Sequence, residues 1–377
     1  MPLFRKQRRA IGRQIVRVGH LIRQMLPGRK TLPGIQDLPT RILIIRPFFL
    51  GDILLCLPIA QAIKRQRPDT QISWLLRQEW TDLIRDPSPV DEVIPFSQKK
   101  MHSIRAVGEF MRVTRELRKR SFELVINLSW DRSSILWAWA SGAPFRIGIE
   151  EYGRPRLLSL LHTTTLPAPE RSGDERHMAD FYYEPLRLLG FGPRENTPQV
   201  FSTHPEREKV EQRLSRWEGI SSFVLIHPGG RLAYKRWPVE RFAELIHHLQ
   251  KETTHPIVLV CGPGEELWAA NPAAALASER ILFWPAPSLG ELMALAERAA
   301  LFIGNDSGPM HLSAACGCRV VAIVGTESTR WNPLGNGHQI IRGATGLDDV
   351  TVQQVSDTAL KVLGKYCQAT SYFRGLP

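Results

Sequence analysis

The sequence has few cysteines and no long apolar run, and each shortage excludes a class of protein. The five cysteines among its 377 residues include no Cys-x-x-Cys pair, which argues against a disulfide scaffold. The longest apolar run, residues 53–63, is interrupted by Pro58 and Gln61 and is shorter than the roughly 18 residues that a spanning helix needs. The N-terminus lacks the apolar core of a secretory signal. We therefore expect buried thiols in a reducing compartment and no membrane span.

Motifs that hold nucleotides, metals or redox centres in other proteins are missing as well. The phosphate-binding pattern GxxxxGK(S/T) does not occur, and Leu267 stands where the dinucleotide fingerprint would need a glycine after Gly262-Pro-Gly264. No Asp-x-Asp pair is present to hold a metal on a diphosphate. Cys316 and Cys318 could belong to a metal or redox motif, but no clustered Cys or His completes one. These absences argue against P-loop hydrolysis and hydride transfer, and we expect neither a cofactor nor a metal.

The positive charge of the chain is concentrated near its N-terminus. The formal net charge is +12, yet residues 1–30 alone hold nine Lys or Arg and no Asp or Glu. The remaining residues hold 40 bases and 37 acids, so the body is nearly neutral. A nucleic-acid enzyme usually spreads its bases over a folded face. We therefore expect no nucleic-acid partner and assign the charge to a separate tail.

Apolar residues in this tail recur at helical spacing. The spacing alternates between four and three residues along a stripe formed by Ile11, Ile15, Val18, Ile22 and Met25. Basic residues surround the stripe, as in helices that lie among anionic lipid headgroups. Pro-Gly pairs at residues 27–28 and 33–34 then end the helix. We predict an anionic membrane surface as partner of residues 1–30, with a helix docked on the protein's own core, or a disordered basic arm, as alternatives.

Strand and helix patterns alternate along the rest of the chain. Strand patterns fall at residues 41–45, 72–76, 92–94, 123–127, 145–149, 223–226, 257–260, 281–283, 301–303 and 320–324. Helical stretches between them, notably residues 103–120 and a helix opened by Pro238, indicate doubly wound parallel sheets. Because a passage rich in Pro, Gly and Glu separates two halves, we expect an α/β fold in three parts. These are a tail and linker at 1–37, an N-terminal Rossmann-like domain at 38–195 and a C-terminal Rossmann-like domain at 196–377.

Two glycine-bearing loops follow strands of the second half, at the edge where doubly wound sheets bind ligands. In residues 227–238, Gly229 and Gly230 allow close backbone approach, and Lys235 precedes a helix N-terminus that favours an anion. In the next loop, Glu265 follows a strand and could accept ribose hydroxyl groups. A plain strand–helix loop with solvated bases is the alternative for Lys235.

A third loop, residues 304–311, leads straight into a helix. The backbone amides of Ser307 and Gly308 at the helix start would bind a phosphate. Asp306 suits the N-cap of this helix, and capping alone would explain it. The three loops together predict a site for an anionic, nucleotide-like ligand.

Four sequence segments occur in a characteristic order and spacing. They are residues 41–58 (RILIIRPFFLGDILLCLP), 227–238 (HPGG, then KRWP), 262–265 (GPGE) and 305–315 (NDSGPMHLSAA). In this order they resemble glycosyltransferase family 9, the lipopolysaccharide heptosyltransferases and their relatives. The resemblance extends across roughly residues 40–340 and leaves residues 1–37 outside. Four segments in this order point to the family far more specifically than any one segment would.

The resemblance implies a GT-B fold, in which two Rossmann-like domains face each other across a cleft. The N-terminal domain would then be the acceptor side and the C-terminal domain would bind the nucleotide-sugar donor. The resemblance also implies inverting, metal-independent transfer from an ADP-heptose-type donor to a lipid-linked saccharide, on the cytoplasmic face of the inner membrane. The matching positions imply that Asp52 is the catalytic base. They imply that Lys235 contacts the donor phosphates and sugar and that Glu265 binds the nucleotide ribose. The segment that holds the donor sugar and diphosphate would include Asp306, Ser307, Gly308 and His311. Residues 47–50, Pro-Phe-Phe-Leu, differ from the small polar residues frequent there in the family, which puts the acceptor's identity in question.

A mechanism follows from these assignments. Asp52 would take the proton of an acceptor hydroxyl as it attacks the anomeric carbon. Lys235 and the amides near Ser307 would stabilise the charge on the leaving diphosphate. A structural role for Asp52 as a helix N-cap is the alternative. Two other functions remain open: a nucleotide-sugar epimerase of the same fold, and a membrane-attached sugar-binding protein without turnover.

Overall fold

A computed structural model describes residues 31–97, 104–150, 157–167, 176–217, 222–265, 278–326 and 329–373. The basic tail predicted at residues 1–30 lies outside them. The described residues form two compact units. The first holds the residues up to Phe48 together with Leu55–Asn196, and the second holds Phe49–Leu54 and the residues from Thr197 onward. No helix within these described ranges is long and apolar enough to cross a membrane.

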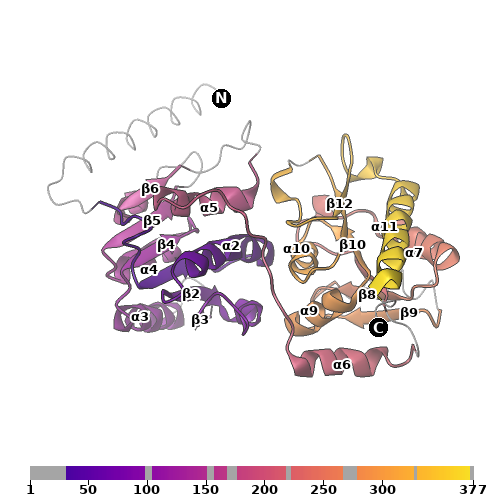
Figure 1. The fold of residues 1–377 in the computed structure, drawn as a ribbon, viewed down its shortest axis with the longest axis horizontal. Helices are drawn as coiled ribbons and strands as arrows, with labels where there is room; N and C mark the ends of the chain where they lie inside the picture. Colours follow the sequence, from indigo (N-terminus) through magenta and orange to yellow (C-terminus); the bar gives the residue numbers. More distant parts are fainter. Residues whose placement is uncertain are drawn as a thin grey trace. The chain divides into compact units, whose positions relative to one another are not determined.

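The first unit is built on a parallel sheet with flanking helices (Figure 1). Its strands lie in the order β3-β2-β1-β4-β5-β6, with β1 next to both β2 and β4. The strands are β1 Arg41–Ile45, β2 Gln71–Arg77, β3 Glu92–Phe96, β4 Leu124–Asn127, β5 Phe145–Ile149 and β6 Thr164–Leu166. The helices are α2 Leu50–Gln66, α3 Ile104–Lys119, α4 Arg132–Ala140 and α5 Met178–Leu188. The first turn of α2 is the part that groups with the second unit.

The second unit repeats this plan (Figure 1). Its strand order is β12-β11-β10-β7-β8-β9, again with parallel pairing. The strands are β7 Val224–His227, β8 Ile257–Cys261, β9 Ile281–Pro285, β10 Leu301–Asn305, β11 Val320–Val324 and β12 Gln339–Arg342. The helices are α6 His204–Leu214, α7 Val239–Glu252, α9 Leu289–Arg298, α10 Gly308–Ala315 and α11 Val352–Phe373.

The two sheets have the same strand topology. In each, the chain builds three strands outward from the centre and then returns to the middle for the next three, so β1 lies beside β4 and β7 lies beside β10. This is the doubly wound arrangement, and it confirms the α/β fold predicted from the sequence. Ligands of such sheets bind at the carboxyl ends of the strands where the order reverses. In the second unit that place is the end of β7 and β10.

The central strands are buried, in agreement with their apolar sequences. Ile42–Ile45 of β1 and all of β7, β8, β10 and β11 are buried, as expected for central parallel strands covered on both faces. Helix α7 buries Phe242, Leu245, Ile246 and Leu249, which recur at helical spacing. Its N-cap is Pro238, and the helix proper begins one residue later.

The edge strands β6 and β12 have no counterpart among the predicted strands. β6 has three residues, all half-buried, and β12 is mostly exposed. Each pairs with one neighbour only, at the end of its sheet. Their residues therefore carry little of the apolar pattern that marks the central strands.

Candidate functional site

The loops after β7 and β10 meet through an ion pair. Lys235 lies in a short 3-10 turn between β7 and α7, and Asp306 comes directly after β10. The Nζ atom of Lys235 donates to Oδ2 of Asp306 at 2.7 Å. The side chains are 19% and 14% exposed, so solvent screens this pair only partly. The structure thus brings together two residues that the sequence placed in separate loops.

Asn305, the last residue of β10, fixes the geometry of both loops. It is fully buried. Its Nδ2 donates to the carbonyl oxygens of Pro228 at 2.6 Å and Gly229 at 3.1 Å. Its Oδ1 accepts a hydrogen bond from the backbone N–H of Trp237 at 3.0 Å. One amide group therefore positions the glycine segment and the Lys235 segment relative to Asp306, a role that the sequence alone did not indicate.

Glu265 joins the loop after β8 to the loop after β7. One carboxylate oxygen accepts the N–H of Gly230 at 3.0 Å, and the other accepts the N–H of Gly262 at 2.8 Å. A Cβ atom at Gly229 would collide with this carboxylate, so the close approach requires glycine there. Arg236 donates from Nε to the Gly230 carbonyl at 2.6 Å and holds the same loop. Each carboxylate oxygen has two lone pairs, so Glu265 keeps capacity for a ligand hydroxyl.

His227 is a second residue of this site that sequence reasoning did not single out. It ends β7, is buried, and places Nε2 3.6 Å from Oε2 of Glu265. Burial lowers the pKa of His227 to about 4, although the Glu265 carboxylate acts in the opposite direction. The imidazole is therefore neutral near pH 7. Its place at the end of a strand next to a glycine pair was the available sequence signal.

The start of α10 corrects one sequence-based interpretation. Ser307, not Asp306, is the N-cap residue of this helix, and its side chain makes no capping hydrogen bond. Asp306 instead pairs with Lys235. Gly308 is the first helical residue, so the backbone amides of the first turn of α10 follow Asp306 closely in the sequence. His311, predicted in the same segment, is buried one turn further on.

Asp52 lies in the first turn of α2 and is 8% exposed. Because α2 begins at Leu50, Asp52 is the third helical residue, and the N-cap interpretation of this carboxylate is wrong. A negative charge in the first turn still interacts favourably with the helix dipole. The turn itself, residues 49–54, belongs to the second unit by contact. A Cβ atom at Gly51 would lie 2.8 Å from Cδ2 of His311, so this turn packs against α10.

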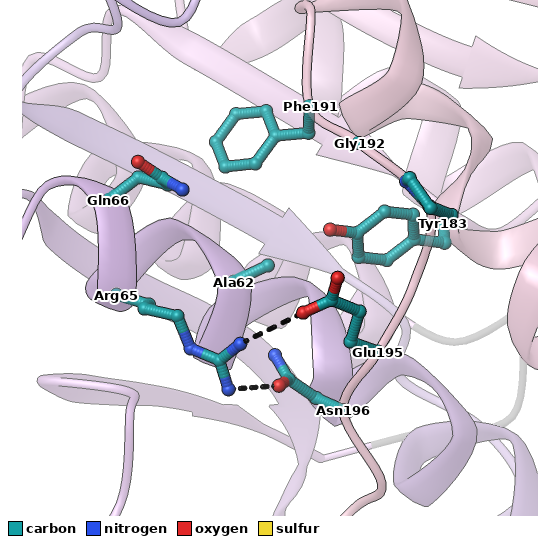
Figure 2. Close-up of a pocket in the computed structure, with 9 residues that line it drawn as sticks. Ala62, Arg65, Gln66, Tyr183, Phe191, Gly192, Glu195 and Asn196 are labelled. Atoms are coloured by element: carbon teal, nitrogen blue, oxygen red, sulfur yellow. Dashed lines mark hydrogen bonds and ion pairs between the residues drawn. The ribbon is translucent and has the colours of Figure 1, made fainter.

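A small pocket in the first unit involves none of the predicted site residues (Figure 2). It has a volume of about 110 Å³ and lies between the last turn of α2 and the segment after α5. Arg65 contacts that segment through an ion pair with Glu195 and a hydrogen bond to Asn196. Burial raises the pKa of Tyr183, whose ring lines the pocket. These contacts attach α2 to the last residues of the unit.

Four cysteines have side chains that the structure describes. They are Cys56, Cys261, Cys316 and Cys318, and none of the four is in a disulfide. Burial raises the pKa of Cys318 to about 12 and raises that of Cys316 as well. Both thiols therefore stay protonated and unreactive at neutral pH. In the part of the chain that the structure describes, no group of three His, Cys, Asp or Glu is arranged to hold a metal ion.

Comparison with known proteins identifies the family. The sequence profile of glycosyltransferase family 9 (heptosyltransferase) matches residues 110–358. Lipopolysaccharide heptosyltransferase 3 of Escherichia coli (strain K12) is 26% identical over 290 residues, which cover 75% of this chain and 82% of that protein.

Solved structures share the fold. A family 9 glycosyltransferase from Veillonella parvula superposes with a TM-score of 0.78 at 22% identity, over 86% of this chain and 97% of that one. The Escherichia coli heptosyltransferase WaaC, solved with ADP, gives a TM-score of 0.70 at 19% identity, over 85% of this chain and 99% of that one. The same enzyme, solved with ADP-2-deoxy-2-fluoro heptose, gives 0.68. The predicted GT-B fold is thereby confirmed. The chain belongs to glycosyltransferase family 9, the heptosyltransferase family, and is a glycosyltransferase.

Proposed function

We propose that this enzyme transfers a heptose-type sugar from an ADP-sugar to the core of lipopolysaccharide or to a related lipid-linked saccharide, with inversion and without a metal. The observation that carries the proposal is the Lys235–Asp306 pair, at the carboxyl ends of β7 and β10 where doubly wound sheets bind ligands. The names of its relatives support the same substrates: Escherichia coli heptosyltransferase 3 is named for lipopolysaccharide, and WaaC binds ADP and an ADP-heptose analogue.

The donor site is assigned to the three loops of the second unit. Lys235 supplies a cation for the diphosphate, and the amides of Ser307 and Gly308 at the start of α10 supply N–H donors. Asp306 holds the Lys235 ammonium in place and would meet the donor sugar. Glu265 would accept ribose hydroxyls with the lone pairs that the amides of Gly230 and Gly262 leave available.

Asp52 is assigned as the general base. The acceptor oxygen attacks the anomeric carbon while Asp52 takes its proton, and the bond from that carbon to the diphosphate oxygen breaks. Because attack and departure occur on opposite faces of the carbon, the configuration inverts. Lys235 and the α10 amides would stabilise the negative charge that develops on the leaving diphosphate, so no divalent cation is needed to stabilise it.

A membrane location completes the proposal. The acceptor is lipid-linked, and residues 1–30 carry nine basic residues and an apolar stripe at helical spacing. Such a segment would bind an anionic bilayer by its cations and its apolar face. We assign the enzyme to the cytoplasmic face of the inner membrane, with no nucleic-acid partner.

The test is a transfer assay with purified full-length protein, ADP-heptose, and lipopolysaccharide truncated at successive core sugars. The expected result is release of ADP together with a mass increase of one heptose on one of the truncated acceptors. An epimerase would convert the donor without any acceptor. A sugar-binding protein would bind ADP-heptose and release no ADP. Either of these two results would refute the proposed transfer.

A further inference from the structure

The two consecutive phenylalanines before Asp52 lie in different environments. Phe48 is half-buried and packs edge-on against Phe96 of the first unit's core, with ring centroids 6.2 Å apart. Phe49 has 49% of its surface exposed. An aromatic ring of this size is usually buried, because each such ring removes a large apolar area from water. Single exposed apolar residues are common on protein surfaces, so the case for Phe49 rests on its backbone and its contacts.

The backbone of Phe49 is also unusual. Its φ angle is +67°, in the left-handed region that bulky side chains rarely adopt and that glycine adopts readily. Strain of this kind is concentrated at functional sites, where the surrounding structure holds it in place. At Phe49 the chain thus keeps a large aromatic side chain in a backbone conformation suited to glycine.

A cation from the donor loop lies over the ring. The guanidinium carbon of Arg231 is 4.5 Å from the centroid of Phe49. Arg231 directly follows the glycine pair that contacts Glu265. This cation–π contact fixes the orientation of the ring. The two residues belong to the same compact unit.

Phe49 is anchored to the turn that carries Asp52. The carbonyl of Phe49 accepts the N–H of Ile53 at 3.0 Å, so Phe49 is the residue on which the first turn of α2 closes. Asp52 is held in that same turn. Phe49 and Asp52 therefore lie within one helical turn of each other.

We propose that Phe49, oriented by Arg231, is a stacking platform for the acceptor saccharide and helps to determine which acceptor is used. The ligand class is a pyranose that presents a face of C–H groups to the aromatic ring. This inference rests on the proposed function, since it assigns the acceptor to the Asp52 side of the reaction. The adenine base of the donor is the other flat group that could stack there, and the experiment separates the two.

The test compares steady-state constants of the full-length enzyme with ADP-heptose and the truncated lipopolysaccharide that serves as acceptor. Phe49→Ala and Phe49→Gly should raise the acceptor KM about tenfold, the usual scale of one aromatic contact, and leave the donor KM unchanged. Phe49→Tyr and Phe49→Trp should keep the acceptor KM within about twofold of the wild-type value, because they retain the ring. Phe201→Ala is the matched control, since Phe201 is 45% exposed in the same unit.

Phe49→Gly separates binding from a structural role, because it relieves the backbone strain while removing the ring. A higher acceptor KM in a variant at least as thermostable as wild type supports the platform. An unchanged acceptor KM in both Phe49→Ala and Phe49→Gly would overturn the inference, as would a rise confined to the donor KM. If the wild-type enzyme itself transfers no sugar, the proposed function fails, which is a separate and recognisable outcome.

Discussion

Lys235 and Asp306 face each other at 2.7 Å across two loops that follow adjacent strands of one sheet. The pair is partly shielded from water, so removing one partner leaves the other charge poorly compensated. In the proposed donor site, a diphosphate would meet an ammonium that a carboxylate already holds in place. Under this proposal, loss of Lys235 should affect both donor binding and departure of the diphosphate.

We expect Lys235→Gln to lower the transfer rate by about 10²- to 10³-fold, the scale for losing one group that stabilises developing negative charge. Lys251→Gln, which removes an exposed cation on α7 of the same unit, should have little effect. Calorimetric titration with ADP on Lys235→Gln and on the Lys235→Gln/Asp306→Asn double variant distinguishes two roles. Full recovery of ADP affinity in the double variant would mean that Lys235 only neutralises Asp306.

Asp52→Asn should lower turnover by about 10²- to 10⁴-fold while ADP binding survives, because the amide keeps the size of the carboxylate but cannot take a proton. Asp52 is the third residue of α2, so a role as the N-cap residue no longer competes as an explanation. Single-turnover transfer and ADP titration on the same variant give both numbers. Turnover at the wild-type rate would place the base elsewhere in the enzyme.

Transfer should be unaffected by excess EDTA, because Lys235 and the α10 amides are assigned the charge of the leaving diphosphate. The measurement is the initial rate with and without chelator, followed by addition of magnesium or manganese. A rate that disappears with EDTA and returns with either metal would contradict this assignment.

Deletion of residues 1–30 should leave a folded enzyme that no longer binds anionic liposomes. The deleted segment carries nine basic residues and no acid. Each cation near an anionic surface contributes about 1 kcal/mol, and salt weakens the attraction. Co-sedimentation at low and high salt measures the effect, with neutral liposomes as control. Equal binding of both proteins to anionic liposomes would refute the membrane role of the tail.

His227 should make the protein less stable in acid. Its pKa is about 4 in the folded protein and near 6.5 when unfolded, so the unfolded chain binds more protons between these values. Stability should therefore fall as the pH drops from 6.5 to about 4, by up to about 3 kcal/mol. His227→Asn should flatten this part of the profile, measured as the urea midpoint against pH. His247→Gln, at an exposed position on α7, should leave the profile unchanged.

The sequence alone determined the architecture and the location of the glycine-bearing loops that form the candidate site. Buried strand segments such as residues 42–45 and 320–324 are apolar throughout, and helical patterns separate strands along the chain, so a doubly wound α/β fold follows from local pattern. The glycines and charged residues at strand ends are also a local sequence pattern, and they predicted where these loops lie. The short edge strand β12 escaped prediction because an exposed strand needs no apolar pattern.

The tertiary structure decided which partner each polar side chain has. Asp306 pairs with Lys235, 71 residues away, instead of capping α10, and Glu265 binds the amide of Gly230, 35 residues away. Asn305 joins two loops although nothing beside it in the sequence suggests that role. A local sequence pattern indicates whether a residue lies in a helix or a strand and whether it is buried. These partners, by contrast, depend on strand order, because β7 becomes the neighbour of β10 only when the whole sheet has formed.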